Sequence, residues 1–210
     1  MSAIILSACI LFSAYLTIWS DAKGRRRSFH VLKPLTTALV ITVALIARTP
    51  VPPAYKTLVL AGLLCSLLGD IALMFPEKWF TAGLISFLAA HVFYILAFKP
   101  GPGRPISLGM FVPFLIFGLL MFRILAPSLG RLKLPVFVYI AAITAMAGLA
   151  AGRFVDGGGT RPLLAFAGAV LFLVSDSVLA YDRFAKKLGP AQAIILGTYF
   201  PAQLLIALSI

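Results

Sequence analysis

Two aspartates lie inside long apolar runs of the sequence. Asp70 lies in LLCSLLGDIALMF, residues 63–75, and Asp176 lies in GAVLFLVSDSVLAY, residues 168–181. The chain has four other acidic residues, all in or beside polar breaks between apolar runs: Asp21, Glu77, Asp156 and Asp182. A charged Asp near the centre of a membrane helix costs at least about 2.5 kcal/mol on insertion scales. The placement of Asp70 and Asp176 therefore predicts a function for both carboxyl groups.

Two carboxyl groups in one apolar pocket can divide the work of an acid and a base. Removal from water favours the neutral form of a carboxyl group, and two neighbouring carboxyl groups lose their protons at different pH values. One protonated and one ionised carboxyl can act as general acid and general base on a bond that breaks. This chemistry suits hydrolysis of an acid-labile bond, and it also suits proton-coupled transport. Either Asp70 or Asp176 can be the acid.

Other polar residues interrupt the apolar segments. If these segments cross a membrane, the polar residues lie in the same half of it as the two aspartates or near its middle. We expect these side chains to bind substrate or support the site: Lys33, Ser66, His91, Tyr94, Tyr139, Ser175, Gln192, Tyr199 and Gln203. Gly62, Ser66 and Gly69 form a small-residue surface beside Asp70. Such surfaces let helices pack closely, so we expect the aspartates to point into a helix bundle and not at lipid.

The elements that carry these residues are predicted to be membrane-spanning helices. The chain has 210 residues, of which 61% are hydrophobic and 11% charged, which is too apolar for a soluble domain. A bilayer core of about 30 Å needs roughly 20 apolar residues in a helix. Eight stretches qualify: 2–20, 31–48, 56–75, 80–98, 106–125, 134–152, 161–181 and 190–209. We therefore predict an all-α polytopic membrane protein, with a single eight-helix transmembrane domain over residues 1–210.

The distribution of Lys and Arg predicts how the chain is oriented in the cell membrane. The odd-numbered connections hold twelve of these residues, and the even-numbered connections hold six: Arg48, Lys56, Lys99, Arg104, Arg153 and Arg161. By the positive-inside rule, the odd connections face the cytoplasm and both termini face outside. Asp70 and Asp176 then lie at one depth, each roughly 7–8 Å from the cytoplasmic end of its helix.

The net charge of +12 does not indicate a nucleic-acid partner. The basic residues lie between apolar runs and not on one soluble face, so we assign them to orientation and to contact with membrane lipids. Both cysteines lie in apolar runs, and no zinc, nucleophile-elbow or phosphate-loop pattern is present in the sequence. We therefore expect no metal and no cofactor.

The spacing of the two aspartates suggests an internal duplication. Asp70 and Asp176 are 106 residues apart, close to half of the chain. Their surroundings, LLGDIALMF and LVSDSVLAY, share a small residue before the Asp, a Leu three residues after it and an aromatic residue five after it. Four helices in each half would make a parallel 4+4 repeat, in which matching helices run the same way.

Structural roles are the alternative for individual residues of this set. Asp70 or Asp176 alone could be a partner for Lys33 or could join two helices, and His91 could be a core histidine bonded to a neighbouring helix. Four further side chains could be ordinary interhelical hydrogen-bonding groups: Tyr139, Gln192, Tyr199 and Gln203.

Four segments carry most of the expected site residues. They are the Gly-Asp pair at 69–70, AAHVFYI at 89–95, GAVLFLVSDSVLA at 168–180 and YFPAQLLI at 199–206. With KPL at 33–35 and the eight-helix layout, they resemble the YhhN-like lysoplasmalogenase family over nearly the whole chain. The seventh-helix segment is the most specific part of this resemblance.

The resemblance implies an integral membrane hydrolase that acts on a lysophospholipid. It would cleave the vinyl ether bond of lysoplasmalogens to a fatty aldehyde and a glycerophospho-alcohol, without a metal or organic cofactor. Asp70 and Asp176 would be the catalytic pair, and Lys33 would meet the substrate phosphate or tune an Asp. Three side chains would shape or polarise the site: His91, Tyr139 and Tyr199.

The substrate chain would lie between helices, with its headgroup toward the cytoplasm. Vinyl ether cleavage begins with protonation on carbon, which gives an oxocarbenium ion that water attacks, so a proton donor, a base and nearby negative charge suit it. The alternative function is a proton-coupled transporter or lipid carrier of the inner membrane, for which a repeat with paired acids would also serve. A structural or lipid-binding membrane protein is the third interpretation.

Overall fold

The chain folds into a bundle of long helices. The computed structural model describes residues 2–47, 51–101 and 107–210, and this part contains helices and no strand. Three short 3-10 turns flank α5: η1 (Leu108–Phe111), η2 (Ala126–Ser128) and η3 (Gly130–Leu132). The long helices are α1 (Ser2–Ala22), α2 (Arg26–Ile46), α3 (Pro53–Leu73), α4 (Pro76–Phe98), α5 (Val112–Leu125), α6 (Lys133–Gly157), α7 (Thr160–Phe184) and α8 (Ala191–Leu208). The predicted all-α fold is confirmed.

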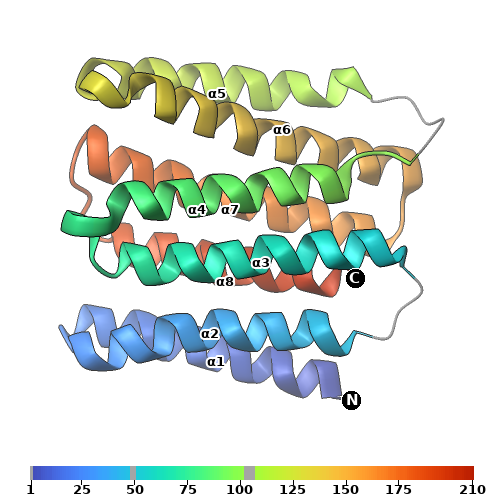
Figure 1. The fold of residues 1–210 in the computed structure, drawn as a ribbon, viewed down its shortest axis with the longest axis horizontal. Helices are drawn as coiled ribbons and strands as arrows, with labels where there is room; N and C mark the ends of the chain where they lie inside the picture. The colour runs from blue at the N-terminus through green and yellow to red at the C-terminus, as the bar shows by residue number, and fades with distance from the viewer. Residues whose placement is uncertain (1, 48–50, 102–106) are drawn as a thin grey trace.

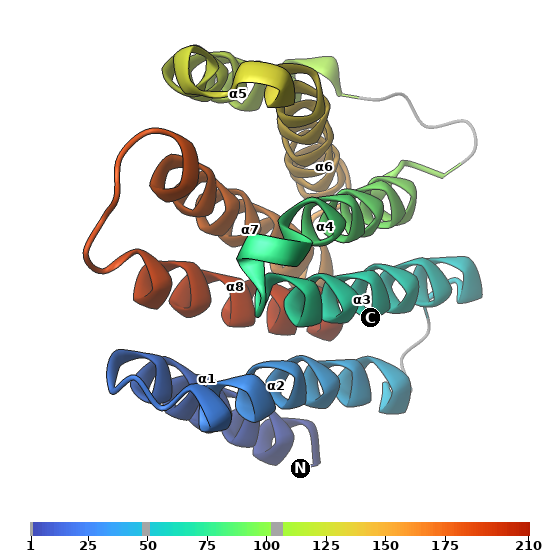
Figure 2. The same ribbon diagram turned by 60° about the vertical axis from the view of Figure 1, so that its left-hand side comes forward.

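The helices run side by side along the long axis of the molecule, and consecutive helices are antiparallel (Figure 1). The closest consecutive pairs are α3 with α4 and α7 with α8. Helix α8 also contacts α1, α2 and α3, whereas α6 contacts α4, α5 and α7. In Figure 2, α1 and α2 form one edge of the bundle and α5 lies at the opposite edge. The site residues come from α2 and from the helices between these edges.

The helices begin and end at backbone signals that lie beyond the apolar stretches. Helices α3, α4 and α5 carry Pro in the first turn, where its missing N–H costs no hydrogen bond. Helix α6 ends before Gly158, whose φ of +59° is left-handed. Helix α4 therefore starts before the predicted segment 80–98, and α6 continues past the predicted segment 134–152. In both helices polar residues extend the helix beyond the hydrocarbon region.

Eight helical segments in the described part of the chain are long and apolar enough to cross a membrane. Large apolar side chains are exposed on the outside of the bundle, among them Ile4, Phe12, Leu119 and Leu134. Polar side chains, in contrast, are buried inside it, including Lys33, Asp70 and His91. An apolar exterior around a partly polar interior is the arrangement that a bilayer requires. The protein is an integral multi-pass membrane protein.

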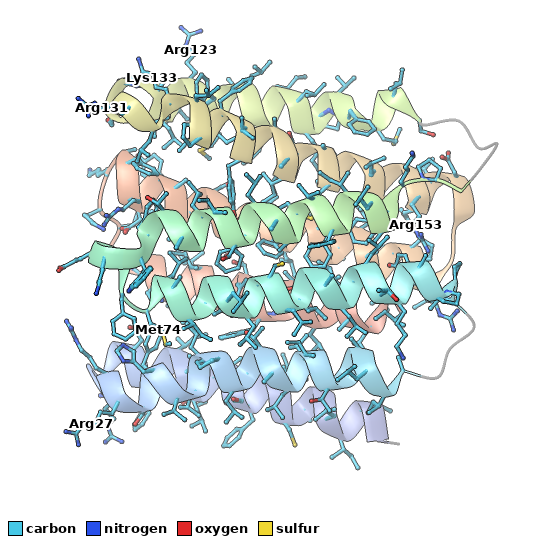
Figure 3. All side chains as sticks on the ribbon, viewed as in Figure 1. Arg27, Met74, Arg123, Arg131, Lys133 and Arg153 are labelled. Atoms are coloured by element: carbon cyan, nitrogen blue, oxygen red, sulfur yellow. The ribbon has the colours of Figure 1, made fainter. Side chains whose placement is uncertain are left out.

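Basic residues concentrate at one end of the bundle. The connections α1–α2, α3–α4, α5–α6 and α7–α8 lie together at this end, and both termini lie at the other (Figure 1). Figure 3 places Arg27, Arg123, Arg131 and Lys133 here, which we call the basic end, and Arg153 at the opposite end. Two cations counted on the opposite side, Arg48 and Arg104, lie outside the described residues. The sidedness in the cell remains a prediction from the positive-inside rule.

The small-residue surface beside Asp70 is a helix contact, as expected. The ring of Tyr94 on α4 lies where a Cβ at Gly62 would be, and the ring of Phe87 approaches Gly69 in the same way. These contacts bring α3 and α4 close together, which turns Asp70 away from lipid.

Candidate active site

Asp70 is held by a complete set of donors from two neighbouring helices. Its side chain is 1% exposed, and its Oδ1 lies 3.3 Å from Nζ of Lys33 on α2. Thr37, one turn further along α2, donates its hydroxyl to Oδ2 at 2.6 Å. The hydroxyl of Tyr199 on α8 donates to the same oxygen at 2.7 Å. One cation and two hydroxyl donors match an ionised carboxylate, which can only accept hydrogen bonds.

Asp176 has neutral, mostly aromatic surroundings. The hydroxyl of Tyr139 on α6 donates to Oδ2 of Asp176. Nε2 of His91 on α4 lies 3.6 Å from the same oxygen, which is too far for a hydrogen bond. Both described polar contacts of Asp176 are thus made by Oδ2, and no Lys or Arg pairs with it in the described part of the chain. The side chain is 11% exposed, more than that of Asp70.

The imidazole of His91 is enclosed by aromatic rings. It packs edge-on against Tyr139 and Phe172, with centroids 5.0 and 4.8 Å apart. Neither ring nitrogen has a hydrogen-bond partner within the described ranges. A neutral imidazole beside Asp176 leaves that carboxyl without a compensating charge.

The two carboxylates line one cavity. We call it the polar cavity, and its polar lining consists of Lys33, Asp70, Ser175, Asp176, Asp182, Arg183, Lys187, Gln192 and Tyr199. Its volume is about 810 Å³ with its open mouth included, and it extends toward the basic end, where α7 leads into the α7–α8 connection. The ring of Phe172 packs against Tyr199, which bonds Asp70, and against His91, which lies beside Asp176, with ring centroids 5.5 and 4.8 Å apart.

A second cavity meets the first at Asp176. This apolar groove has a volume of about 590 Å³ with its open side included. It is lined by Leu73, Phe80, Leu84, Phe87, Met121, Val136, Tyr139, Ile140, Ile143, Asp176, Ser177, Leu179, Ala180 and Phe184. Five residues line both cavities: Leu73, Phe80, Phe87, Asp176 and Leu179. Asp176 is the ionisable member of the five, so its carboxyl lies where an apolar channel opens into a polar one.

The predicted site residues fall into three groups. Six of them line the polar cavity: Lys33, Asp70, Ser175, Asp176, Gln192 and Tyr199. Tyr139, which lines the apolar groove, donates to Asp176, and His91 approaches the same carboxylate oxygen without lining either cavity. The remaining three line neither cavity: Ser66, Tyr94 and Gln203.

The three residues outside the cavities make internal hydrogen bonds. The hydroxyl of Ser66 donates to the carbonyl of Gly62 in its own helix at 2.9 Å. Tyr94 donates to Oε1 of Gln203 at 2.8 Å, which ties α4 to α8 one turn beyond Tyr199. These residues therefore support the packing around the site and do not border its open space.

Sequence reasoning missed Thr37, Arg183 and Lys187. Thr37 lies one turn after Lys33, so it shares the helix face that meets Asp70. Arg183 lies two turns after Asp176 on α7, and this spacing brings it to the same cavity. A search for polar residues at helical spacing from Lys33 and from Asp176 would have found Thr37 and Arg183.

The chain matches the YhhN family over residues 28–210. It is 34% identical to the human protein "Lysoplasmalogenase TMEM86B", over 100% of this chain and 85% of the relative. It is 36% identical to the bovine protein "Lysoplasmalogenase TMEM86A", over 73% of this chain and 65% of the relative. The "Uncharacterized membrane protein YhhN" of Shigella flexneri is 28% identical over 96% of both chains. No solved structure matches the chain.

Proposed function

The chain belongs to the YhhN family, and from this premise we propose that it is an integral membrane lysoplasmalogenase. In this proposal the hydrolase cleaves the vinyl ether bond of lysoplasmalogens, and two mammalian relatives carry the name lysoplasmalogenase. The products are a fatty aldehyde and a glycerophospho-alcohol. The substrate is a lysophospholipid that reaches the site from the membrane.

The observation that carries the assignment of the site is the position of Asp176 at the junction of the two cavities. A lysoplasmalogen has an alkenyl chain on one side of its scissile bond and a glycerophosphate on the other. Its chain fits the apolar groove, its headgroup fits the polar cavity, and the vinyl ether then lies beside Asp176. Ligand sites of this kind combine an apolar lining with a few placed polar groups.

We assign the role of general acid to Asp176. In its protonated form Asp176 needs no counter-ion, which agrees with its neutral neighbours Tyr139 and His91. It transfers a proton to the alkenyl carbon remote from the ether oxygen, and the electron pair of the double bond forms the new C–H bond. The product is an oxocarbenium ion, beside which the carboxylate of Asp176 and the ionised Asp70 supply negative charge.

We assign the role of base to Asp70. As water attacks the oxocarbenium carbon, Asp70 takes a proton from the water, and a hemiacetal forms. The hemiacetal collapses when Asp70 returns this proton to the departing glycerol oxygen and Asp176 accepts the proton of the hemiacetal hydroxyl. Aldehyde and alcohol leave, and both carboxyl groups regain their starting forms. General acid–base steps of this kind contribute about 10²- to 10⁴-fold each.

The basic end faces the cytoplasm in this proposal, and both termini face outside. Because the polar cavity extends toward the basic end, the headgroup enters from the cytoplasmic leaflet. The Lys and Arg side chains of the basic end attract the negatively charged phosphates of lipids in that leaflet.

Release of aldehyde from a lysoplasmalogen by the purified protein in detergent tests the function. We expect Asp176→Asn and Asp70→Asn each to lower the turnover at least about 10²-fold while the protein stays folded, as judged by gel filtration and circular dichroism. Asp156→Asn is the matched control, since Asp156 bonds Ser107 far from both cavities and should leave turnover unchanged. Full activity of both site variants would refute the catalytic assignment.

The same assay separates the hydrolase from a proton-coupled carrier. A hydrolase needs no membrane gradient, so detergent-solubilised protein should release aldehyde. If solubilised protein is inactive, and lipid moves across sealed vesicles only when a proton gradient is applied, the carrier function replaces the proposal.

A further inference from the structure

The charged side chains that line the polar cavity are not all paired with one another. Lys33 pairs with Asp70 at 3.3 Å. Lys187 pairs with Asp182 at 2.8 Å, and the second oxygen of Asp182 accepts the backbone N–H of Leu188. Two charged or chargeable side chains of the lining are left over, namely Arg183 and Asp176.

Arg183 packs against an aromatic ring, and its acidic neighbour in the chain, Asp182, is paired with Lys187. Its Cζ lies 4.8 Å from the centroid of the Phe80 ring, and Phe80 lines both cavities. Among the described residues, no carboxylate oxygen lies within 4.0 Å of its guanidinium. The side chain is exposed, so its N–H donors are open to a ligand. A guanidinium over an aromatic ring keeps its planar edge free for two parallel hydrogen bonds to an oxyanion.

The net charge of the cavity lining favours binding of an anion. With Asp176 protonated, as a general acid must be before reaction, the paired charges cancel and Arg183 leaves one positive charge. The phosphodiester of a lysophospholipid headgroup carries one negative charge at its phosphate. A single phosphodiester therefore supplies the negative charge that neutralises the cavity.

The spacing between Arg183 and Asp176 fits the same ligand. They are seven residues apart on α7, which places them on one face about 10–11 Å apart along the axis. In a lysoplasmalogen, seven bonds join the carbon that accepts the proton to the phosphorus, a span of roughly 8–9 Å when extended. A phosphate at Arg183 therefore brings the vinyl ether within reach of Asp176.

We propose that Arg183 is the phosphate-binding residue of the polar cavity and makes the protein selective for lysophospholipids over neutral ether lipids. The assignment rests on the proposed function for the identity of the lipid. It gives Lys33 no contact with the phosphate, because the buried ammonium group of Lys33 contacts both a carboxylate oxygen and the backbone carbonyl of Asp70.

Binding of uncleavable saturated ether lipids tests the proposal without any need for turnover. The probes are a 1-O-alkyl lysophosphocholine and the 1-O-alkylglycerol of the same chain length, titrated into the detergent-solubilised protein. We expect the wild type to prefer the phospholipid and Arg183→Gln to lose about tenfold in affinity for it, with affinity for the alkylglycerol unchanged. Arg183→Lys should recover part of the loss, because it keeps the charge without the paired donors.

Lys186→Gln is the matched control. Lys186 is exposed three residues away and lines neither cavity, so its loss removes the same charge from the same surface. If Lys186→Gln lost as much affinity for the phospholipid as Arg183→Gln, the loss would come from surface charge in general, and the proposal would be overturned. Equal loss for both lipids in Arg183→Gln would overturn it too, since the residue would then act on packing.

Two further measurements complete the test. One distinguishes a lipid phosphate from free phosphate, and the other distinguishes failure of this proposal from failure of the proposed function. Inorganic phosphate should compete weakly with the phospholipid in the wild type and not at all in Arg183→Gln. Strong competition would mean that the site takes free phosphate and would overturn the lipid assignment. If the protein binds lysophospholipid through Arg183 but releases no aldehyde from a lysoplasmalogen, the proposed function fails and the phosphate site stands.

Discussion

The ion pair between Lys33 and Asp70 is a test of how the site is stabilised. Nζ and Oδ1 are 3.3 Å apart, and the two residues are 5% and 1% exposed. At an effective dielectric constant of about 20, their gross Coulomb attraction is about 5 kcal/mol. Removal of one partner leaves the other charge buried, and such changes typically cost about 3–5 kcal/mol.

Lys33→Met keeps the aliphatic stem and removes the ammonium group. We expect it to lower the free energy of unfolding by about 3–5 kcal/mol, because Asp70 then has only two hydroxyl donors. Asp70→Asn should cost a similar amount, since it leaves the Lys33 cation unpaired. The double variant contains no buried charge at this position, so its loss should be several kcal/mol smaller than the sum of the single losses.

Reversible unfolding in mixed detergent micelles, followed by circular dichroism, measures the three losses. Aldehyde release by the same samples separates stability from catalysis, because the double variant should fold and remain inactive without its base. Additive losses would refute the ion pair, and hydrolysis by the double variant would refute the role of Asp70.

Three further predictions concern other parts of the site and its support. Tyr139→Phe removes the donor to Asp176 and should lower kcat about 10- to 100-fold in the aldehyde assay with KM little changed; an effect on KM alone would contradict a role in proton transfer. Gly168→Ala places a methyl group 2.8 Å from the carbonyl oxygen of Ala202 and should cost about 1–3 kcal/mol, whereas Gly197→Ala, with open space around it, should be neutral or stabilising in thermal unfolding. Equal effects of the two changes would mean that α7 and α8 are not closely packed there. Leu84→Trp narrows the apolar groove and should raise KM for long-chain substrates more than for short-chain ones, so a uniform change in KM would place the chain elsewhere.

The helices could be predicted from the sequence because the bilayer sets both their length and their composition. The burial of Asp70 and Asp176 was predictable for the same reason, since an acid in an apolar span must be enclosed. Helix ends were not predictable from apolar residues. At Pro76 and Gly157 the limits depend on backbone geometry and on polar turns that project from the hydrocarbon.

The individual partners of the aspartates could not be read from the sequence. Thr36 and Thr37 are neighbours in one helix, and a Thr in a helix commonly bonds the carbonyl four residues earlier. Thr36 does so, with Leu32, whereas the hydroxyl of Thr37 donates to Asp70. The difference depends on which side of α2 faces α3, and this is a property of the packing. For Lys33 too, only the structure distinguishes a contact with Asp70 from a free position near a phosphate.

The predicted duplication gives a physical reading of the difference between the two carboxylates. Lys33 and Tyr139 are separated by 106 residues, as are Asp70 and Asp176. Each aspartate therefore meets the corresponding position of the preceding helix, which is a cation for Asp70 and a neutral phenol for Asp176.

One turn further along α2 and α6, the corresponding residues again differ in polarity. Thr37, which donates to Asp70, corresponds at this spacing to Ile143, which lines the apolar groove. Asp70 thus lies among a cation and hydrogen-bond donors, one of which, Tyr199, comes from the other half of the chain. Asp176 lies among aromatic and aliphatic groups. In the proposed mechanism, the different residues at these two positions of the preceding helices give Asp70 the surroundings of a base and Asp176 those of an acid. Equal surroundings would make the two carboxyl groups compete for the same protonation state.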